Sequence, residues 1–272
     1  MTTMLCDLDL PRRLEEAESF ASETFARSLA RRRPDIGAAV EPLAGGRAVF
    51  AGPGSPLSEA KAMGLHGTVT EADFDRLETF YFGRREPCRV FVCPMADSSL
   101  IDGLGRRGYR LSGFENFLAM PLVPDAPEPS AIPGIEIQPA DRDAADLYAS
   151  VVAPNFAGPE GPSDEHHDLI ASMFGMDHCA AFLAYLDGQP AGGGAVLIHR
   201  GVALLAGAAT LPAYRNRGVH AALHHARLAL ARRSGCDLAA QGAHPGSTSQ
   251  RNAERRGLRV AYTRAILVRD PM

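Results

Sequence analysis

The chain has 272 residues, of which 46% are hydrophobic, so it can form two domains of about 100–150 residues, each with its own core. Its formal net charge of −4 argues against nucleic acid as a partner, so any phosphate-bearing ligand must be bound by a local group of residues. No segment approaches the ~20 apolar residues of a membrane span, and we expect a cytoplasmic protein with no membrane partner. Five cysteines without paired spacing are expected to be reduced thiols, namely Cys6, Cys88, Cys93, Cys179 and Cys236.

The first half of the chain alternates predicted helices and strands. Apolar residues recur at helical spacing in its longer segments, and short apolar runs lie between glycines and prolines. Thr70 and Asp73 have the spacing of a helix cap. The expected elements are a helix over 11–33, strands over 38–40 and 47–51, a helix over 70–80, a strand over 89–93, a helix over 98–107 and a strand over 114–120.

A glycine-rich loop from Gly52 to Pro56 follows one of these strands and half resembles a dinucleotide-binding fingerprint. The third glycine is missing, and Pro53 and Pro56 lack the N–H donors that a phosphate needs. We therefore favour a turn-rich loop. The alternative, a dinucleotide site for redox chemistry, predicts binding of NAD(P).

A proline-rich segment separates the two halves. Five prolines fall between residues 121 and 133, with small and acidic side chains between them, which predicts a stiff, extended linker. The expected organisation is a domain over residues 1–122, a linker over 123–133 and a second domain over 134–272.

The second half again alternates strands and helices. Gly192, Gly193 and Gly194 lie in an expected strand, where they predict a bulge or a close backbone neighbour. The expected elements are a strand over 134–138, helices over 141–152 and 163–173, a hairpin of strands 180–186 and 191–199, a strand over 202–210, a helix over 219–233, a strand over 236–241, a helix over 247–256 and a strand over 259–268.

A basic glycine turn, Tyr214 to His220, lies between the strand over 202–210 and the helix over 219–233. Such a junction directs unpaired backbone N–H groups, the positive end of a helix and two guanidinium groups towards one point, which suits a pyrophosphate. On the helix, five apolar residues share one face: Val219, Ala222, Leu223, Ala226 and Leu230. The opposite, polar face is expected to carry His220, His224 and Arg227.

The histidines do not predict a metal site. His220 and His224 are four residues apart on the helix, and His166 and His167 are adjacent, but neither pair has the intervening Glu or the nearby Cys of common zinc sites.

The two halves share an internal similarity. Residues 98–118 align without a gap with residues 247–267, so that residue n of the first half corresponds to residue n + 149 of the second. Both segments read as the end of a helix, an Arg-Arg-Gly turn and the start of a strand, which predicts two tandem copies of one domain type. The first copy has no counterpart to the segment Arg215 to His220.

The second half resembles the GCN5-related N-acetyltransferases (GNAT). Their signature between a strand and a helix is Arg or Gln, two residues, Gly, one residue and then Gly or Ala; Arg215 to Val219 fit it, and His220 departs from it. The segment Ser249 to Leu258 is similar to a later helix of the family. The resemblance implies an α/β fold with a mixed sheet, in two tandem copies with a degenerate first copy.

The resemblance further implies an N-acetyltransferase that uses acetyl-CoA as co-substrate, without a metal, and transfers the acetyl group directly to the amine of an unidentified acceptor. Main-chain groups of the pyrophosphate loop and of the preceding strand would bind the cofactor, and one strand N–H would stabilise the thioester oxygen. The cofactor-binding residues expected are Ala209, Thr210, Leu211, Arg215, Asn216, Arg217, Gly218, Val219, His220, Ser249 and Asn252.

The acid and the base are less clearly marked. The tyrosine that protonates the thiolate in many family members aligns with Ala253, and the usual asparagine aligns with Gly246. Ser249 and Tyr262 are the candidate catalytic residues, although Ser249 can equally be a helix-surface residue and Tyr262 a strand aromatic. The candidates for a base acting through water are Glu160 and Asp164. A rival hypothesis is a non-catalytic protein that binds acyl-CoA or another protein.

Overall fold

The computed structural model describes residues 7–124, 131–157 and 161–271, which form two compact units. Unit 1 combines Met1–Met120 with Ala240–Met272, and unit 2 is Pro121–Ala239. The last 33 residues, from Ala240, thus pack with the first part of the chain. Residues 125–130 of the expected linker and the candidate base Glu160 lie outside the described residues.

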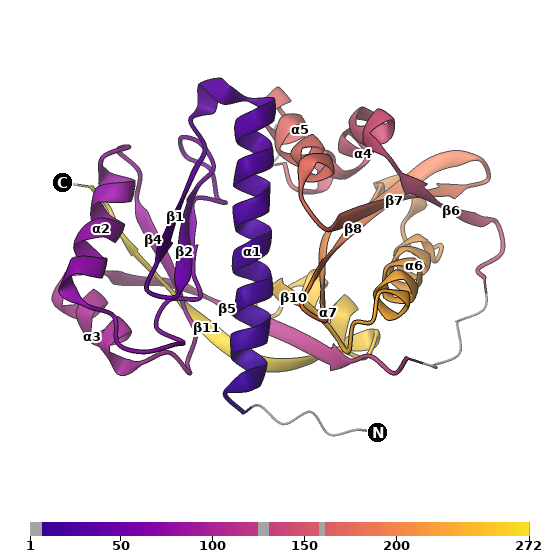
Figure 1. Ribbon diagram of the computed structural model, residues 1–272. Helices are drawn as coiled ribbons and strands as arrows, with labels where there is room; N and C mark the ends of the chain where they lie inside the picture. Colours follow the sequence, from indigo (N-terminus) through magenta and orange to yellow (C-terminus); the bar gives the residue numbers. More distant parts are fainter. Residues whose placement is uncertain (1–6, 125–130, 158–160, 272) are drawn as a thin grey trace. The chain divides into compact units, whose positions relative to one another are not determined.

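Unit 1 is a sheet with helices on both faces (Figure 1). Its strands lie in the order β1-β2-β3-β4-β11-β5-β10. The helix α1 covers one face, and α2 and α3 cover the other, where an apolar core contains Phe74, Leu77 and Leu104. The elements are α1 (Asp9–Arg32), η1 (Pro34–Ile36), β1 (Ala39–Leu43), β2 (Gly46–Phe50), β3 (Glu59–Lys61), α2 (Glu71–Phe82), β4 (Cys88–Val92), α3 (Ser98–Arg106), β5 (Arg110–Pro121), β10 (Leu238–Ala243), α7 (Thr248–Arg255) and β11 (Arg259–Arg269).

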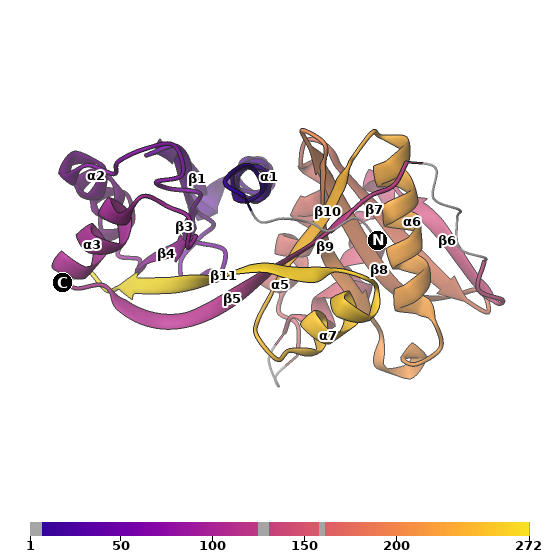
Figure 2. The ribbon, with the colours of Figure 1, turned by 90° about the horizontal axis from the view of Figure 1, so that it is seen from below.

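The two long strands of unit 1 occupy equivalent positions in the internal similarity. β11 lies between β4 and β5 and pairs with both in antiparallel fashion, so the two long strands run side by side (Figure 2). Arg110 pairs with Val268. Their equivalents 149 positions away, Arg259 and Ala119, pair with each other, so the register of the two strands is nearly symmetric. Glu115 and Arg264 are themselves equivalent and face each other at the centre. The pairing of β11 with β4 and β5 explains why the end of the chain packs in unit 1.

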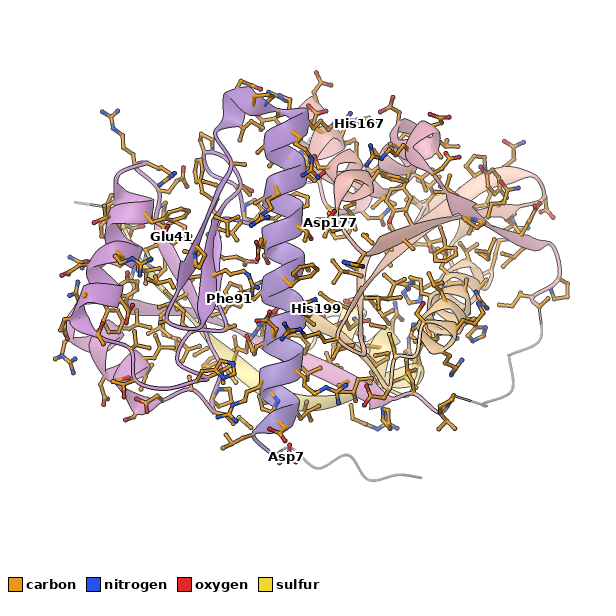
Figure 3. All side chains as sticks on the ribbon, in the orientation of Figure 1. Asp7, Glu41, Phe91, His167, Asp177 and His199 are labelled. Atoms are coloured by element: carbon orange, nitrogen blue, oxygen red, sulfur yellow. The ribbon has the colours of Figure 1, made fainter. Side chains whose placement is uncertain are left out.

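A network of buried charges lies between α1 and the sheet of unit 1. Arg264 is fully buried and forms ion pairs with Glu15, Glu18 and Glu115. Its guanidinium carbon is 4.9 Å from the ring centroids of Phe91, labelled in Figure 3, and Phe117. Burial alone would raise the pKa of Glu18, but Arg264 and Lys61 outweigh it and lower that pKa to about 2. Burial raises the pKa of Glu15, because there it outweighs the effect of Arg264.

Unit 2 is an antiparallel sheet in the order β9-β8-β7-β6, with α4 and α5 on one face and α6 on the other (Figure 1). Each consecutive pair of its last three strands is joined by a two-residue turn, at 187–188 and 200–201. The elements are β6 (Ile135–Ala140), η2 (Arg142–Ala144), α4 (Ala145–Val152), η3 (Ala153–Asn155), α5 (Asp164–Ala171), η4 (Ser172–Gly175), β7 (Cys179–Leu186), β8 (Gln189–His199), β9 (Val202–Thr210), η5 (Pro212–Tyr214) and α6 (Val219–Arg233).

The structure confirms the expected α/β class with a mixed sheet, and it corrects one feature of α6. The prediction that His224 and Arg227 lie on a polar, outer face is wrong: their exposed fractions are 3% and 2%. The buried stripe follows the spacing Val219, Leu223, Arg227 and Ala231, so an arginine stands in the row that packs on the sheet. The short β3 was not expected, since three residues give no periodicity to read.

Candidate functional site

The strand β9 contains a bulge. Gly193 pairs with Ala209 and Ala195 with Ala206, so Gly194 of β8 faces two residues of β9, Gly207 and Ala208. Gly207 has a φ of +54°, the left-handed conformation that the first residue of such a bulge adopts. The bulge redirects the main chain of β9 just before its end, where the expected pantetheine residues lie.

The three glycines of β8 allow helices to approach both faces of the sheet at the bulge. A Cβ on Gly193 would lie 2.7 Å from Val152 and 2.9 Å from Tyr148, on the α4 face. A Cβ on Gly192 would lie 2.8 Å from Val219, and one on Gly194 would lie 3.2 Å from Arg227, on the α6 face. The predicted close backbone neighbour is present at Gly192, where an added Cβ would lie 2.7 Å from the Ala209 carbonyl, whereas the bulge beside these glycines is in the facing strand β9.

The end of β9 presents its main-chain groups alternately to β8 and to the opposite edge. The Leu211 N–H donates to the Ala191 carbonyl at 2.9 Å, and the Leu211 carbonyl accepts from the Tyr214 N–H at 2.9 Å. The main-chain N–H and carbonyl groups of successive residues in a strand point to opposite edges. Those of Thr210 therefore point away from β8. Of the three residues expected along the pantetheine, Thr210 therefore has its N–H directed away from β8, towards the edge of β9 that neighbours β10.

The basic turn after β9 adopts a conformation that needs its glycine. Asn216 and Gly218 have φ values of +61° and +90°. A Cβ on Gly218 would lie 3.2 Å from Ile132 and 3.4 Å from Ile135, so both the backbone angle and the packing disfavour a side chain. The turn leads directly into α6, with Gly218 at the N-cap.

The N-terminus of α6 is not closed by the chain's own side chains. No side chain caps it, its first turn contains no acidic residue, and among the described residues no acceptor is bonded to the N–H groups of Arg217, Gly218 and Val219. The first N–H groups of any helix lack an intrahelical partner, and the helix dipole adds partial positive charge there. The turn can therefore bind an anion such as a pyrophosphate.

The two arginines of the turn are held at the surface of unit 2 by weak contacts. Arg215 donates to the Asn155 side-chain oxygen at 2.9 Å, and Arg217 pairs with Asp187 at 3.0 Å. The Arg217 side chain is half exposed and the Asp187 side chain is mostly exposed, so this ion pair contributes at most ~1 kcal/mol to stability. Both guanidinium groups can reorient towards a phosphate at little cost.

The residues expected from the later helix lie in unit 1. Ser249 is exposed on α7, and its hydroxyl accepts from Gln241 at 3.3 Å. Asn252 is half-buried on the same helix, and Ala253 packs in an apolar cluster with Leu118. Sequence reasoning missed Gln250, which bonds the Gly246 N–H at 2.7 Å and Asn116 at 3.2 Å, thereby fixing the start of α7. Contacts 134 residues apart leave no periodic signal in the sequence.

Tyr262 is part of the buried network of unit 1. Its exposed fraction is 6%, its hydroxyl donates to Glu15 at 3.0 Å, and its ring stacks on Phe117 at 5.7 Å. Burial raises its pKa, and Glu15 raises it further. These contacts are those of a tyrosine that ties β11 to α1.

The other candidates from the sequence occupy exposed or closed positions. Asp164 is exposed at the start of α5, and the described residues contain no group of three or more His, Cys, Asp or Glu able to hold a metal ion. In the loop that half resembles a dinucleotide fingerprint, the Gly54 N–H already donates to the Glu86 carboxylate at 2.8 Å, which leaves a negative charge where a phosphate would bind. No helix in the described part of the chain combines the length and apolar character needed to cross a membrane.

Comparison with known proteins agrees with this geometry. The model of the acetyltransferase (GNAT) family matches residues 138–258. A GCN5-related N-acetyltransferase from Kribbella flavida aligns with a TM-score of 0.61 and 19% identity, covering 94% of this chain and 96% of that chain. A tandem GNAT protein from the clavulanic acid biosynthesis pathway aligns with a TM-score of 0.56 and 14% identity, covering 82% of this chain and 73% of that chain. A search of the curated proteins finds no match.

Residues 138–258 therefore form a domain of the acetyltransferase (GNAT) family. At identities below 20% the two solved structures establish the fold alone, and that fold includes a tandem member. The resemblance stated from the sequence is confirmed for residues 138–258, which match the GNAT family, and the fold is similar to that of solved GNAT structures.

Proposed function

We propose that the protein is an N-acetyltransferase that transfers an acetyl group from acetyl-CoA to the amine of an acceptor by direct attack in a ternary complex. The observation that carries the proposal is the basic, uncapped N-terminus of α6, which directly follows the bulged strand β9 within the GNAT domain. An anion site and a redirected strand edge next to each other fit the two ends of coenzyme A.

In this proposal the N–H groups of Arg217, Gly218, Val219 and His220 bind the pyrophosphate, and Arg215 and Arg217 supply charge. Asn216 gives the turn its shape through its left-handed conformation. The pantetheine follows Ala209 to Leu211, and a main-chain N–H stabilises the thioester oxygen as it becomes negative, a contribution of ~3 kcal/mol in comparable sites. Holding the thioester and amine together supplies much of the remaining rate.

The groups that move protons stay predictions. Ser249 fits the role of the acid better than Tyr262, because its hydroxyl is exposed, whereas the Tyr262 hydroxyl is bonded to a buried carboxylate. Asn252, three residues from Ser249 on the same helix, is proposed to bind the cofactor beside it. For the base, Asp164 is exposed and can act through water.

The proposal is tested by calorimetry with acetyl-CoA, followed by a thiol-release assay over a panel of amines. We expect binding in the micromolar range, typical of enzyme cofactors, and release of CoA with at least one class of amine. Absence of binding would contradict the proposal together with the acyl-CoA-binding form of its rival.

The rival function, a non-catalytic module that binds acyl-CoA or another protein, is favoured by one observation. Ala253 aligns with the usual tyrosine acid, and it is buried in an apolar cluster. Its methyl group cannot donate a proton to the departing thiolate. Binding of acetyl-CoA without turnover across the panel would favour this rival.

A further inference from the structure

We infer that Arg227 is a positioning residue for acetyl transfer: from the α6 side of the sheet its guanidinium supports the β9 bulge and adds positive charge behind it. The inference rests on the proposed function. The Arg227 side chain is buried, with an exposed fraction of 2%, and among the described residues no carboxylate pairs with its guanidinium.

The contacts of Arg227 are carbonyl groups. Its Nε donates to the Leu223 carbonyl at 3.1 Å, and one terminal nitrogen lies 3.4 Å from the Ala195 carbonyl of β8. Burial lowers its pKa to about 10, so the group still carries its charge at neutral pH. Burying a charge without a partner of opposite charge is costly, and an apolar side chain of similar size could fill the same space.

The position of the guanidinium coincides with the bulge. A Cβ on Gly194, the residue that faces the two bulged residues, would lie 3.2 Å from the Arg227 Nε and 3.3 Å from its Cζ. A bulge disrupts the ladder locally and leaves main-chain groups without their usual partners. The Ala195 carbonyl, next to the bulge, accepts from the guanidinium.

The other face of the bulge is held by α4. The Tyr148 hydroxyl donates to the Gly207 carbonyl at 2.8 Å, and a Cβ on Gly207 would lie 2.9 Å from Met173. The bulge is thus fixed from both sides, by a hydroxyl on one face and by a guanidinium on the other. Tyr148 also raises the Arg227 pKa, which agrees with their closeness across the bulge.

This arrangement suits a reaction in which negative charge develops on an oxygen bound at the bulge. In a low-dielectric interior, a fixed positive charge acts over several ångströms and strengthens the electrostatic stabilisation given by a main-chain N–H. Arg227 does not need to touch the substrate for this effect, because it acts through the bulged main chain.

The test compares Arg227→Met and Arg227→Lys with Leu228→Met, a repacking control on the same helix. The readouts are the melting temperature, the Kd for acetyl-CoA, the rate of thiol release and the infrared carbonyl band of bound [1-13C]acetyl-CoA. For Arg227→Met we expect an unchanged or higher melting temperature, because a buried charge is removed, and a Kd within about 3-fold of wild type. We expect thiol release to slow by about 10-fold, less than the ~100-fold cost of losing a direct donor.

The carbonyl band distinguishes an electrostatic role of Arg227 from a purely structural one, even without a known acceptor. Polarisation of the thioester lowers its frequency, so the band of Arg227→Met should lie higher than that of wild type, with Arg227→Lys between them and Leu228→Met at the wild-type position. Identical bands in wild type and Arg227→Met, or a lower melting temperature that accounts for the lost rate, would overturn the role of Arg227 alone. Failure of the wild type to bind acetyl-CoA would overturn the proposed function and this inference with it.

Discussion

The N-termini of α2 and α6 hold corresponding places in the two halves, since each helix is followed by a strand, a helix and a long strand, but they are built in opposite ways. At α2 the Thr70 hydroxyl accepts from the Asp73 N–H, and the Asp73 carboxylate accepts from the Thr70 N–H at 2.9 Å. At α6 the N-cap is Gly218, no side chain caps the helix, and Arg215 and Arg217 precede it. The first end is closed and acidic, and the second is open and basic.

A helix end can bind an anion only where the chain leaves its N–H groups unoccupied. The capping box at α2 satisfies two of those groups internally, and Glu71 and Asp73 place negative charge where an anion would bind. We therefore propose that the first half is a degenerate copy of the GNAT fold, retained for structure, and that acetyl-CoA binds at α6.

The arginines of the two units show the same contrast. Arg264 in unit 1 is buried among three carboxylates, whereas Arg215 and Arg217 in unit 2 are exposed and weakly held. Replacing Arg264 with Met should reduce the free energy of unfolding by about 3–5 kcal/mol, because the buried carboxylates lose their counter-charge. Chemical denaturation measures this effect. The control is Arg110→Met, which removes only an exposed pair with Asp270, and equal losses in the two variants would contradict the structural role of Arg264.

The next largest effect is expected at Gly218. Replacing it with Val should raise the Kd for acetyl-CoA by ~100-fold, since a β-branched side chain resists a φ of +90° and would press on Ile132 and so distort the turn. Calorimetry gives the Kd. The matched control is Gly54→Val in unit 1, where φ is +67° and no neighbour lies within 4 Å of an added Cβ. If both variants weaken binding equally, the turn before α6 is not the phosphate site.

Charge reversal at Arg217 should have a smaller effect. Arg217→Glu is expected to raise the Kd for acetyl-CoA by ~10-fold, and the loss should shrink as salt is added, because the interaction is exposed. Asp187→Asn is the control: it breaks the same ion pair but keeps the guanidinium, so its affinity should equal or slightly exceed that of wild type. Equal weakening in the two variants would show that the ion pair, rather than the charge, matters.

Local features of both helix ends could be predicted from the sequence. Thr70 and Asp73 gave the cap, and the turn from Tyr214 to His220 gave the basic glycine junction, because capping and glycine chemistry depend on residues a few positions apart. The triple glycine of β8 likewise predicted close packing, since a missing side chain has few other meanings inside a strand.

Features that depend on distant residues could not be predicted. The placement of β11 between β4 and β5 follows from pairing over about 150 residues, and the burial of Arg227 follows from which face of α6 meets the sheet. Tyr262 read as an ordinary strand aromatic or an acid because nothing near it in the sequence reveals Glu15, which lies 247 residues away. Hydrophobic periodicity reports one face of one element, and these contacts join several.

The smallest expected effect concerns the closed helix end itself. Thr70→Ala should reduce the free energy of unfolding by ~1 kcal/mol, the usual cost of losing an N-cap, while leaving the Kd for acetyl-CoA unchanged. Thr70→Ser, which keeps the hydroxyl, should be stable and serves as the control. Opening α2 in this way gives it no basic residues and leaves Glu71 and Asp73 in its first turn, so no new anion site should appear. A second equivalent of bound acetyl-CoA in Thr70→Ala would show instead that capping alone distinguishes the two ends, and that the arginines beside α6 add little.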